Sequence, residues 1–306
     1  MTRRGATKLA GILPIDKPAG ITSHDVVAAV RRATGEGRVG HAGTLDPSAT
    51  GLLVLLIGPY ARLAPYLSGV SKRYEARIAF GIETDTDDAD GTVTRTAPVP
   101  DLLFQPESAR ERLAALIGAS EQTPPAYSAI KVAGRVAHRE ARSGRPMELV
   151  ARAIEVHEAE LIGVDIASRT WEVAFLVSKG TYIRALARDI GRVSGSAAHL
   201  AALRRTQSGR IRLEDARTLE EVREAAAVGN VAQLFADPLE ALGLPRLEAD
   251  AHAIGAGGRC ASTLTIDLAE GSALAVTVND RLAGVYRVRG RTLVPEVVLD
   301  ATGGAA

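Results

Sequence analysis

The protein's 306 residues are 46% hydrophobic and carry a net charge of +1, which suits one large domain or two unequal ones and singles out no charged partner. A single cysteine, Cys260, excludes a disulfide framework and a cysteine zinc site, and it fits a reducing, cytoplasmic setting. No apolar run reaches the roughly 20 residues of a membrane span, and the first one, residues 9–15, is too short for a signal peptide.

The first elements expected along the chain are an extended segment, a turn and a helix within residues 11–35. Thr22 or Ser23 can cap this helix, and Gly35 can end it. The apolar run that follows, residues 51–63, is a strand or a helix, because its length is compatible with both.

Three later segments have clearer patterns. Residues 71–81 alternate, with Tyr74 on the same face as three further apolar side chains, and they predict a strand. Residues 170–191 predict a strand, a turn at Lys179–Gly180 and a helix, and residues 196–209 predict another short helix.

Proline and glycine are dense in residues 236–250, which are expected to join two domains. After this junction, short β-type runs with turn pairs at Asn279–Asp280 and Arg289–Gly290 predict a small β-rich domain. The expected division is a first domain of residues 1–240 and a second of residues 245–306.

Residues 83–91, "ETDTDDADG", are similar to a calcium loop in composition but not in spacing. With Gly91 at the loop's glycine position, the first and last ligand positions hold Thr86 and Ala97, neither of which is a carboxylate. The segment is therefore expected to be an exposed acidic turn, and a role in shaping a nearby site stays open.

Four basic residues follow one another at intervals of four, four and three: Lys131, Arg135, Arg139 and Arg142. If their segment is helical, they share one face, which suits a phosphate backbone or is an ordinary solvated surface. Charge is also segregated along the chain, since residues 1–80 hold 11 Lys and Arg against 5 Asp and Glu, and residues 121–210 hold 14 against 9. Such segregation can build a basic face on a neutral protein.

Several common enzyme signatures are missing from the sequence. The six histidines are scattered, with no pair at the spacing of a helical metal site. There is no G-x-S-x-G nucleophile motif and no G-x-x-x-x-G-K-[ST] phosphate loop. No metal site is therefore expected.

Asp46 is a lone acid in the glycine-rich stretch "GHAGTLDPSATGLLVLLIG", and residue type alone would make it a turn former. The string "VGHAGTLDPSATGLL", however, resembles the catalytic motif of the TruB family of bacterial tRNA pseudouridine-55 synthases. Further strings resemble that family's other blocks in family order: "GILPIDKPAGITSHD", "SKRYEARIAFGIETDTDDADG", "QTPPAYSAIKVAGRVAHREARSGR", "SKGTYIRALARDIG" and "AHLAALRRTQSG". The resemblance runs from Gly11 to Gly209, and the C-terminal segment is similar, more weakly, to a PUA-type RNA-binding domain.

The resemblance implies an α/β (α+β) fold, with a mixed, largely antiparallel sheet, Asp46 in a central cleft and an RNA-gripping insertion at about residues 122–150. It implies isomerisation of uridine to pseudouridine at position 55 in the T-loop of tRNA, without a cofactor, because only protons enter or leave. The partner is then tRNA, whose uridine must be flipped out of its loop. A cytoplasmic monomer without an obligate protein partner is expected.

The family pattern also assigns roles to single residues. Asp46 would be the nucleophile, Arg184 would pair with it and hold it ionised, and Tyr74 would stack on the uracil and handle a proton. Whether Asp46 serves C6 of the base, C1′ of the ribose or the 2′ proton stays open. The other assignments are substrate binding by His41, Tyr182 and Leu203, support of the catalytic loop by Lys17, and RNA binding by Lys131, Arg135, Arg139 and Arg142.

Three alternatives remain at the level of the sequence. One is a related synthase that depends on a guide RNA and protein partners, and another is a tRNA-binding or RNA-folding protein in which catalysis is secondary. The third is a glycosidase-like hydrolase that uses Asp46, although such an enzyme usually needs a second catalytic carboxylate.

Overall fold

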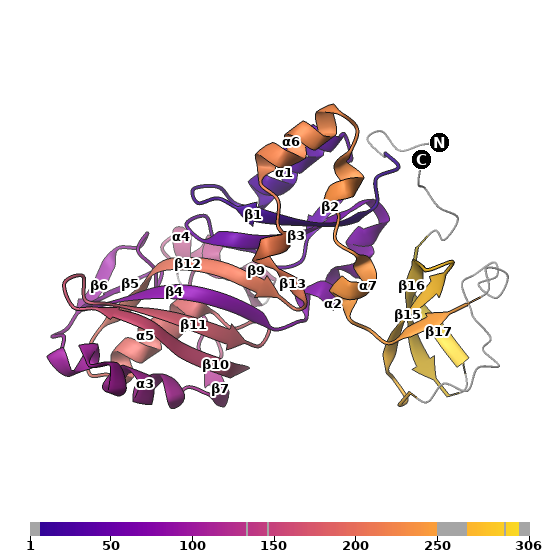
Figure 1. Cartoon of the computed structure of the whole chain (residues 1–306). Helices are drawn as coiled ribbons and strands as arrows, with labels where there is room; N and C mark the ends of the chain where they lie inside the picture. The colour runs from indigo at the N-terminus through magenta and orange to yellow at the C-terminus, as the bar shows by residue number, and fades with distance from the viewer. Residues whose placement is uncertain (1–6, 133, 146, 250–267, 291, 300–306) are drawn as a thin grey trace.

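The computed structural model describes residues 7–132, 134–145, 147–249, 268–290 and 292–299, and Cys260 lies outside these ranges. A large sheet with the strand order β1-β3-β12-β4-β11-β10-β7 forms the body of the molecule, and β2 and β13 add to it at β3 and β12 (Figure 1). Its strands are β1 (Gly11–Lys17), β2 (Val39–His41), β3 (Thr50–Ile57), β4 (Lys72–Phe80), β7 (Gly118–Gln122), β10 (Arg152–Asp165), β11 (Thr170–Val177), β12 (Ala198–Ser208) and β13 (Ile211–Arg212). All neighbouring strands are antiparallel except β12 and β3, which confirms the expected α/β class with a largely antiparallel sheet.

Short helices and hairpins surround this sheet. The α-helices are α1 (Ser23–Thr34), α2 (Ala64–Ser68), α3 (Pro106–Ala114), α4 (Ala137–Arg142), α5 (Ile183–Val193), α6 (Leu219–Ala227) and α7 (Pro238–Leu242). The 3-10 helices are η1 (Gly58–Leu63), η2 (Asp101–Phe104), η3 (Leu213–Asp215) and η4 (Val231–Leu234), and the small hairpins pair β5 (Ile82–Thr84) with β6 (Val93–Thr96) and β8 (Lys131–Val132) with β9 (Arg135–Val136). No helix in the described ranges is long and apolar enough to cross a membrane.

The predicted boundaries of the first helix, α1, are confirmed. Its N-cap is Thr22, whose hydroxyl accepts from the Asp25 amide at 3.1 Å while the Asp25 carboxylate accepts from the Thr22 amide at 2.8 Å. Gly35 ends the helix in the left-handed conformation, with φ of 70°.

The apolar run after residue 50 is strand β3, and it is buried on both faces. Leu53 and Leu55 belong to the core on one side of the sheet, whereas Leu52, Val54 and Leu56 belong to the core on the other side. A strand that is covered on both sides needs apolar residues at every position, so its sequence carries no alternation. This is why the sequence could not distinguish a strand from a helix here.

The helix predicted for residues 196–209 is wrong, because this segment forms strand β12. The strand lies between β4 and the start of β3, and long-range pairing outweighs the local helical preference of its alanines and leucines. Irregularities between Leu200 and Ala202 and between Arg205 and Gln207 shift its register. Each shift interrupts the two-residue period by which a strand is identified in a sequence.

A separate four-stranded sheet forms the C-terminal part of the described chain, as predicted for a small β-rich unit (Figure 1, yellow). Its strands are β14 (Arg246–Glu248), β15 (Ala273–Val278), β16 (Arg281–Arg289) and β17 (Thr292–Val298). Asn279 and Asp280 both have positive φ in the tight turn between β15 and β16. Val285 and Val297 from this sheet share a buried cluster with Leu67 of α2.

Candidate active site

Asp46 lies in the loop between β2 and β3, and the residues on either side of it are held in place. The Ser23 hydroxyl donates to the Leu45 carbonyl and accepts from the Leu45 amide, both at 2.9 Å. The fully buried Lys17 donates through Nζ to the carbonyl of Pro47 at 3.1 Å. The loop around Asp46 is therefore anchored directly before and directly after the carboxylate.

Lys17 extends this anchoring to the turn that precedes α1. Its Nζ also donates to the carbonyls of Pro18 at 2.8 Å and Ile21 at 2.7 Å. Three backbone acceptors thus take the three protons of one buried ammonium. This geometry suits the supporting role that the sequence predicts for Lys17.

Arg205 of β12 holds the first half of the same loop from the opposite side. Its buried guanidinium donates to the carbonyls of Leu52 at 2.6 Å and Gly43 at 3.0 Å. Gly51 permits the close approach of β3 and β12, since a Cβ at this position would lie 2.3 Å from the Arg205 carbonyl oxygen. Sequence reasoning missed both Arg205 and Ser23, because their partners are distant backbone atoms that leave no pattern in the sequence.

The structure brings Asp46 and Arg184 together, as predicted. Arg184 stands in the first turn of α5, and its Nε lies 3.0 Å from Asp46 Oδ2. The arginine side chain is 6% exposed, whereas that of Asp46 is 41% exposed. The Asp46 carboxylate is therefore accessible to solvent, although buried contacts hold the loop that carries it.

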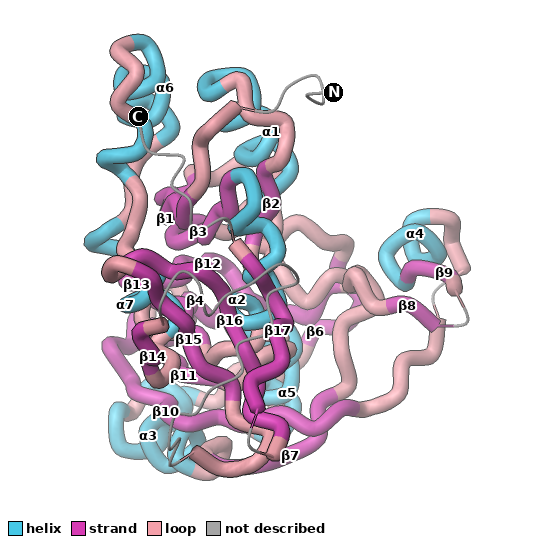
Figure 2. The backbone as a smooth tube through the Cα atoms, turned by 90° about the vertical axis from the view of Figure 1, so that its right-hand side faces the viewer, coloured by secondary structure: helices cyan, strands magenta, loops and turns pink. Residues whose placement is uncertain are grey.

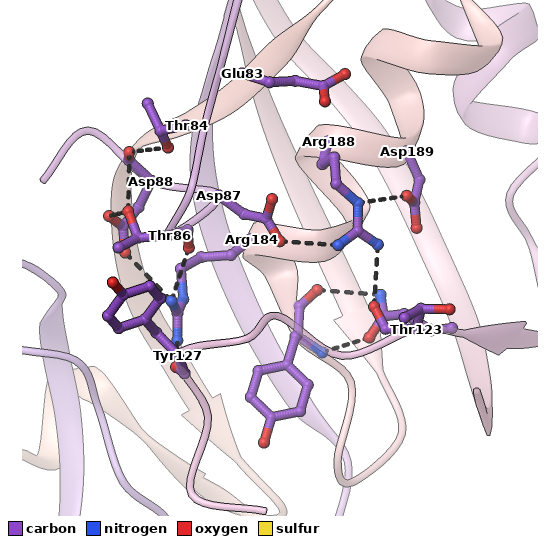
Figure 3. A network of polar contacts seen from close by, with 12 residues as sticks. Glu83, Thr84, Thr86, Asp87, Asp88, Thr123, Tyr127, Arg184, Arg188 and Asp189 are labelled. Carbon is purple, nitrogen blue, oxygen red and sulfur yellow. Dashed lines mark hydrogen bonds and ion pairs between the residues drawn. The ribbon is translucent and has the colours of Figure 1, made fainter. Parts of the chain in front are cut away.

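The other nitrogens of Arg184 bind two further segments (Figure 3). Nη1 donates to the Thr86 carbonyl at 2.8 Å and lies 3.5 Å from Asp88 Oδ2, and Nη2 donates to the Tyr127 carbonyl at 2.9 Å. A guanidinium that is fixed at each nitrogen has one orientation, so it presents Nε to Asp46 in a defined direction.

The effects that shift the pKa of Asp46 differ in relative size from those expected from the sequence. Although its side chain is 41% exposed, the surrounding protein desolvates Asp46 enough to raise its pKa above the usual value. The negative charges of Asp88 and Asp90 act in the same direction, and Arg184 and Lys17 oppose them. Arg184 was expected to control the ionisation of the carboxylate. Burial has the larger effect, so Asp46 is a more basic carboxylate than one in water.

The segment of residues 83–91 is not the exposed acidic turn that its composition predicts. Asp87 and Asp88 are buried, because arginines of α5 bind them: Arg188 Nη1 lies 2.9 Å from Asp87 Oδ2, next to the contact between Arg184 and Asp88. Arg192, one turn further along, binds Glu83. The spacing of these arginines, four residues apart along α5, was the signal in the sequence that could have identified their partners.

Tyr74, Leu203 and Tyr182 lie on three elements around the Asp46 loop. Tyr74 of β4 is 8% exposed and shares its core with Leu45. Leu203 of β12 pairs with Ala76 of β4 and borders a cavity of about 370 Å³, which Ser48 of the Asp46 loop also lines. The predicted roles of these residues in base binding stay predictions.

Tyr182 occupies the N-cap position of α5, two residues before Arg184. Its backbone amide donates to the Gln122 side chain at 2.9 Å, and its carbonyl accepts from the same side chain at 3.1 Å. Burial raises the pKa of the Tyr182 hydroxyl. The tyrosine therefore links α5 to the segment that begins at β7.

His41 is at the end of β2, where its ring lies edge-on against His24 with centroids 5.6 Å apart. Its buried Nδ1 has no hydrogen-bond partner among the residues that the structure describes. Burial lowers the pKa of His41, and the nearby His24 and Arg205 act in the same direction. A buried ring nitrogen that no described residue binds is therefore present five residues before Asp46.

The basic segment is not the single helix that its spacing suggested. Lys131 and Arg135 lie on the β8–β9 hairpin, whereas Arg139 and Arg142 lie on α4. A turn at Gly134, with φ of 79°, interrupts the helical pattern. The hairpin and α4 project from the body of the molecule (Figure 2). All four basic residues are exposed.

Comparisons with known proteins show which family the chain resembles. A model of the TruB family pseudouridylate synthase (N terminal domain) matches residues 31–183, and one of the tRNA pseudouridylate synthase B C-terminal domain matches residues 184–242. The tRNA pseudouridine synthase B of Opitutus terrae is 44% identical over 241 residues, which cover 79% of this chain and 91% of the relative. That of Thermobifida fusca is 45% identical over 237 residues, covering 74% and 78%.

Two solved structures have a similar fold. The Cbf5 chain of a Cbf5–Nop10–Gar1 complex superposes with a TM-score of 0.71 at 23% identity, covering 94% of this chain and 84% of the other. An archaeal box H/ACA sRNP Nop10–Cbf5 complex gives a TM-score of 0.69 at 22% identity, covering 94% and 85%. At these identities the similarity shows the fold alone.

Proposed function

The chain belongs to the TruB family of pseudouridylate synthases and isomerises uridine in tRNA to pseudouridine; we propose that its target is the uridine at position 55 in the T-loop and that Asp46 is the nucleophile. The observation that carries the second part is the ion pair of Asp46 with the buried Arg184, at 3.0 Å, in a loop anchored on both sides of the carboxylate. Asp46 lies in the string that resembles the family's catalytic motif, and Arg184 lies in a second string that resembles another block of the family.

The reaction requires little from the protein beyond one nucleophile, a shaped pocket and a proton acceptor. The N1–C1′ bond of uridine breaks, the uracil turns within the site, a C5–C1′ bond forms, the proton on C5 leaves, and N1 takes up a proton. Because the product is an isomer of the substrate, no redox cofactor or co-substrate takes part. Asp46 adds to C6 or C1′, or assists removal of the 2′ proton, and each route uses its raised basicity.

The surrounding residues give the flipped base its environment. Tyr74 and Tyr182 offer aromatic surfaces and Leu203 an apolar one, on elements adjacent to the Asp46 loop. His41 contacts the RNA where the uridine leaves its stack. Extrusion costs a few kcal/mol, and contacts with the rest of the RNA supply it.

Phosphate contacts on the projecting insertion account for much of the RNA affinity in this proposal. The exposed side chains of Lys131, Arg135, Arg139 and Arg142 can each neutralise a phosphate. The T-arm is recognised mainly by shape and backbone, between the insertion at residues 122–150 and the four-stranded C-terminal sheet. We divide the chain into a catalytic domain of residues 1–240 and a PUA-like domain of residues 245–306, acting together as a cytoplasmic monomer.

Tritium release from a tRNA transcript labelled at uridine C5 tests the proposal. The parent protein should release tritium from the uridine at position 55, and a transcript with cytidine at that position should lack this release. Asp46→Asn should abolish tritium release while the variant still binds tRNA. Free uracil in the product would instead indicate a hydrolase. A folded parent that binds tRNA without turnover would indicate a binding or folding protein, or a synthase that needs a guide RNA.

A further inference from the structure

Arg188 lies one helical turn after Arg184 and joins three segments of the chain (Figure 3). Its Nη1 donates to Asp87 at 2.9 Å, its Nη2 to the Thr123 carbonyl at 3.0 Å, and its Nε to Asp189 at 2.8 Å. The guanidinium is almost fully buried and has no contact with Asp46 among the interactions of the described residues. It therefore connects α5 to the acidic segment and to the segment that follows β7.

These two segments are the ones that hold Arg184. The Thr86 carbonyl, which accepts from Arg184 Nη1, directly precedes Asp87. The Tyr127 carbonyl, which accepts from Arg184 Nη2, is in the same loop as Thr123. Asp87 has a φ of 61°, a left-handed conformation that is uncommon for a residue with a side chain, so the chain turns sharply at this point. Thr86 and Asp87 thereby face neighbouring arginines of one helix.

We propose that the Asp87–Arg188 ion pair is a positioning device for Arg184, which locks together the two loops whose carbonyls orient the guanidinium toward Asp46. The inference rests on the proposed function, in which Arg184 orients the nucleophile. Asp87 and Arg188 act only through Arg184, and neither touches the substrate.

The energetics of the pair point to this role more than to stability. Burial raises the pKa of Asp87 to about 6, although Arg188 opposes the rise. The cost of removing water from the Asp87 carboxylate thus exceeds the electrostatic stabilisation that Arg188 gives it. A buried ion pair of this kind stabilises a fold little compared with apolar side chains of the same size. The ion pair instead fixes the local geometry, because three directional hydrogen bonds hold the planar guanidinium of Arg188 in one orientation.

Arg188→Gln is the main test, and Arg192→Gln is its matched control. Both variants remove an arginine from the same face of α5 and break an ion pair with the segment of residues 83–91, but the Arg192 pair with Glu83 is a turn further from Arg184. Single-turnover rates at saturating tRNA should fall about ten-fold in Arg188→Gln and stay within about two-fold of the parent in Arg192→Gln. The Kd for tRNA should be unchanged in both.

A second pair of variants separates positioning from general damage. Asp87→Asn keeps an oxygen that can accept from Arg188, so it should retain the rate within about three-fold, whereas Asp87→Ala should match Arg188→Gln. An unchanged rate in Arg188→Gln would overturn the inference, as would equal losses in Arg188→Gln and Arg192→Gln.

Hydrogen exchange of the RNA-free protein tests the coupling without any activity. In Arg188→Gln the amides of residues 84–90 and of residues 122–128 should exchange faster together, and in Arg192→Gln residues 122–128 should stay as in the parent. Faster exchange in only one of these segments in Arg188→Gln would refute the coupling. If the parent itself releases no tritium, the proposed function fails, and this experiment still decides the inference.

Discussion

The Arg184 side chain connects Asp46, at 3.0 Å from its Nε, to the Thr86 and Tyr127 carbonyls at its two terminal nitrogens. These partners come from three separate loops, so one planar group sets the position of the carboxylate relative to all of them. The relationship gives Arg184 a geometric role as well as an electrostatic one.

Arg184→Lys should lower the single-turnover rate about a hundred-fold, because an ammonium cannot span three partners in fixed directions. The Kd for tRNA should change little, since Arg184 is buried. Arg223→Lys, on the exposed surface of α6, is the matched control and should behave as the parent. A rate near that of the parent in Arg184→Lys would refute the geometric role.

The rate should depend on the ionisation of Asp46. Its pKa is raised by burial first, with Asp88 and Asp90 adding to the effect, so activity should disappear on acidification at a higher pH than an ordinary aspartate would allow. Asp90→Asn removes one negative charge and should move this acid limb to lower pH. Single-turnover rates across the pH range measure the shift, with the distant Asp101→Asn as control. An acid limb that does not move in Asp90→Asn would contradict the electrostatic assignment.

Lys17→Met should destabilise the fold and loosen the loop. The substitution leaves three buried carbonyls without their donor, those of Pro18, Ile21 and Pro47, and should lower the free energy of unfolding by about 3 kcal/mol. Denaturant titration measures this loss, and Lys8→Met at an exposed position is the control. Equal stabilities of the two variants would show that the ammonium does not hold the loop.

Charge reversal on α4 should weaken tRNA binding and reduce its salt dependence. If Arg139 and Arg142 each contact a phosphate, the double change Arg139→Glu, Arg142→Glu should lower the slope of log Kd against log salt by about two. Arg110→Glu on α3, also exposed and outside the insertion, should leave the slope as it is. The same slope in the double variant and the parent would show that Arg139 and Arg142 do not contact the RNA phosphates.

Lys72 should make stability depend on alkaline pH. Burial lowers its pKa to about 8, from 10.5, and the nearby Arg205 and Lys179 act in the same direction. Between pH 8 and 10.5 the unfolded chain therefore binds more protons than the folded one, so the free energy of unfolding gains about 3 kcal/mol from this residue as pH rises. Lys72→Met should lack that gain, while Lys8→Met should keep it. Parallel curves for the parent and Lys72→Met would be inconsistent with a buried, displaced lysine.

Local features could be predicted from the sequence because each depends on only a few neighbouring residues. Thr22 and Gly35 delimit α1 through backbone conformations that adjacent residues determine. Alternation along β4 marks a strand with one buried face. Asp46 was identified through a string of consecutive residues that resembles a family motif, and Arg184 through a second string of the same kind.

Contacts between residues far apart in the sequence determined the features that could not be predicted from it. Strand β12 exists because β4 and β3 pair with it, against the helical preference of its own residues. Asp87 and Asp88 are buried because arginines about a hundred positions later bind them, and the composition of the acidic segment alone does not reveal such partners. The sequence by itself determined which residues are candidates for the chemistry and where a local element such as α1 begins and ends. Only the tertiary structure decided how the Asp46 carboxylate is oriented and in which direction its pKa moves, since both depend on burial and on charges brought together by folding.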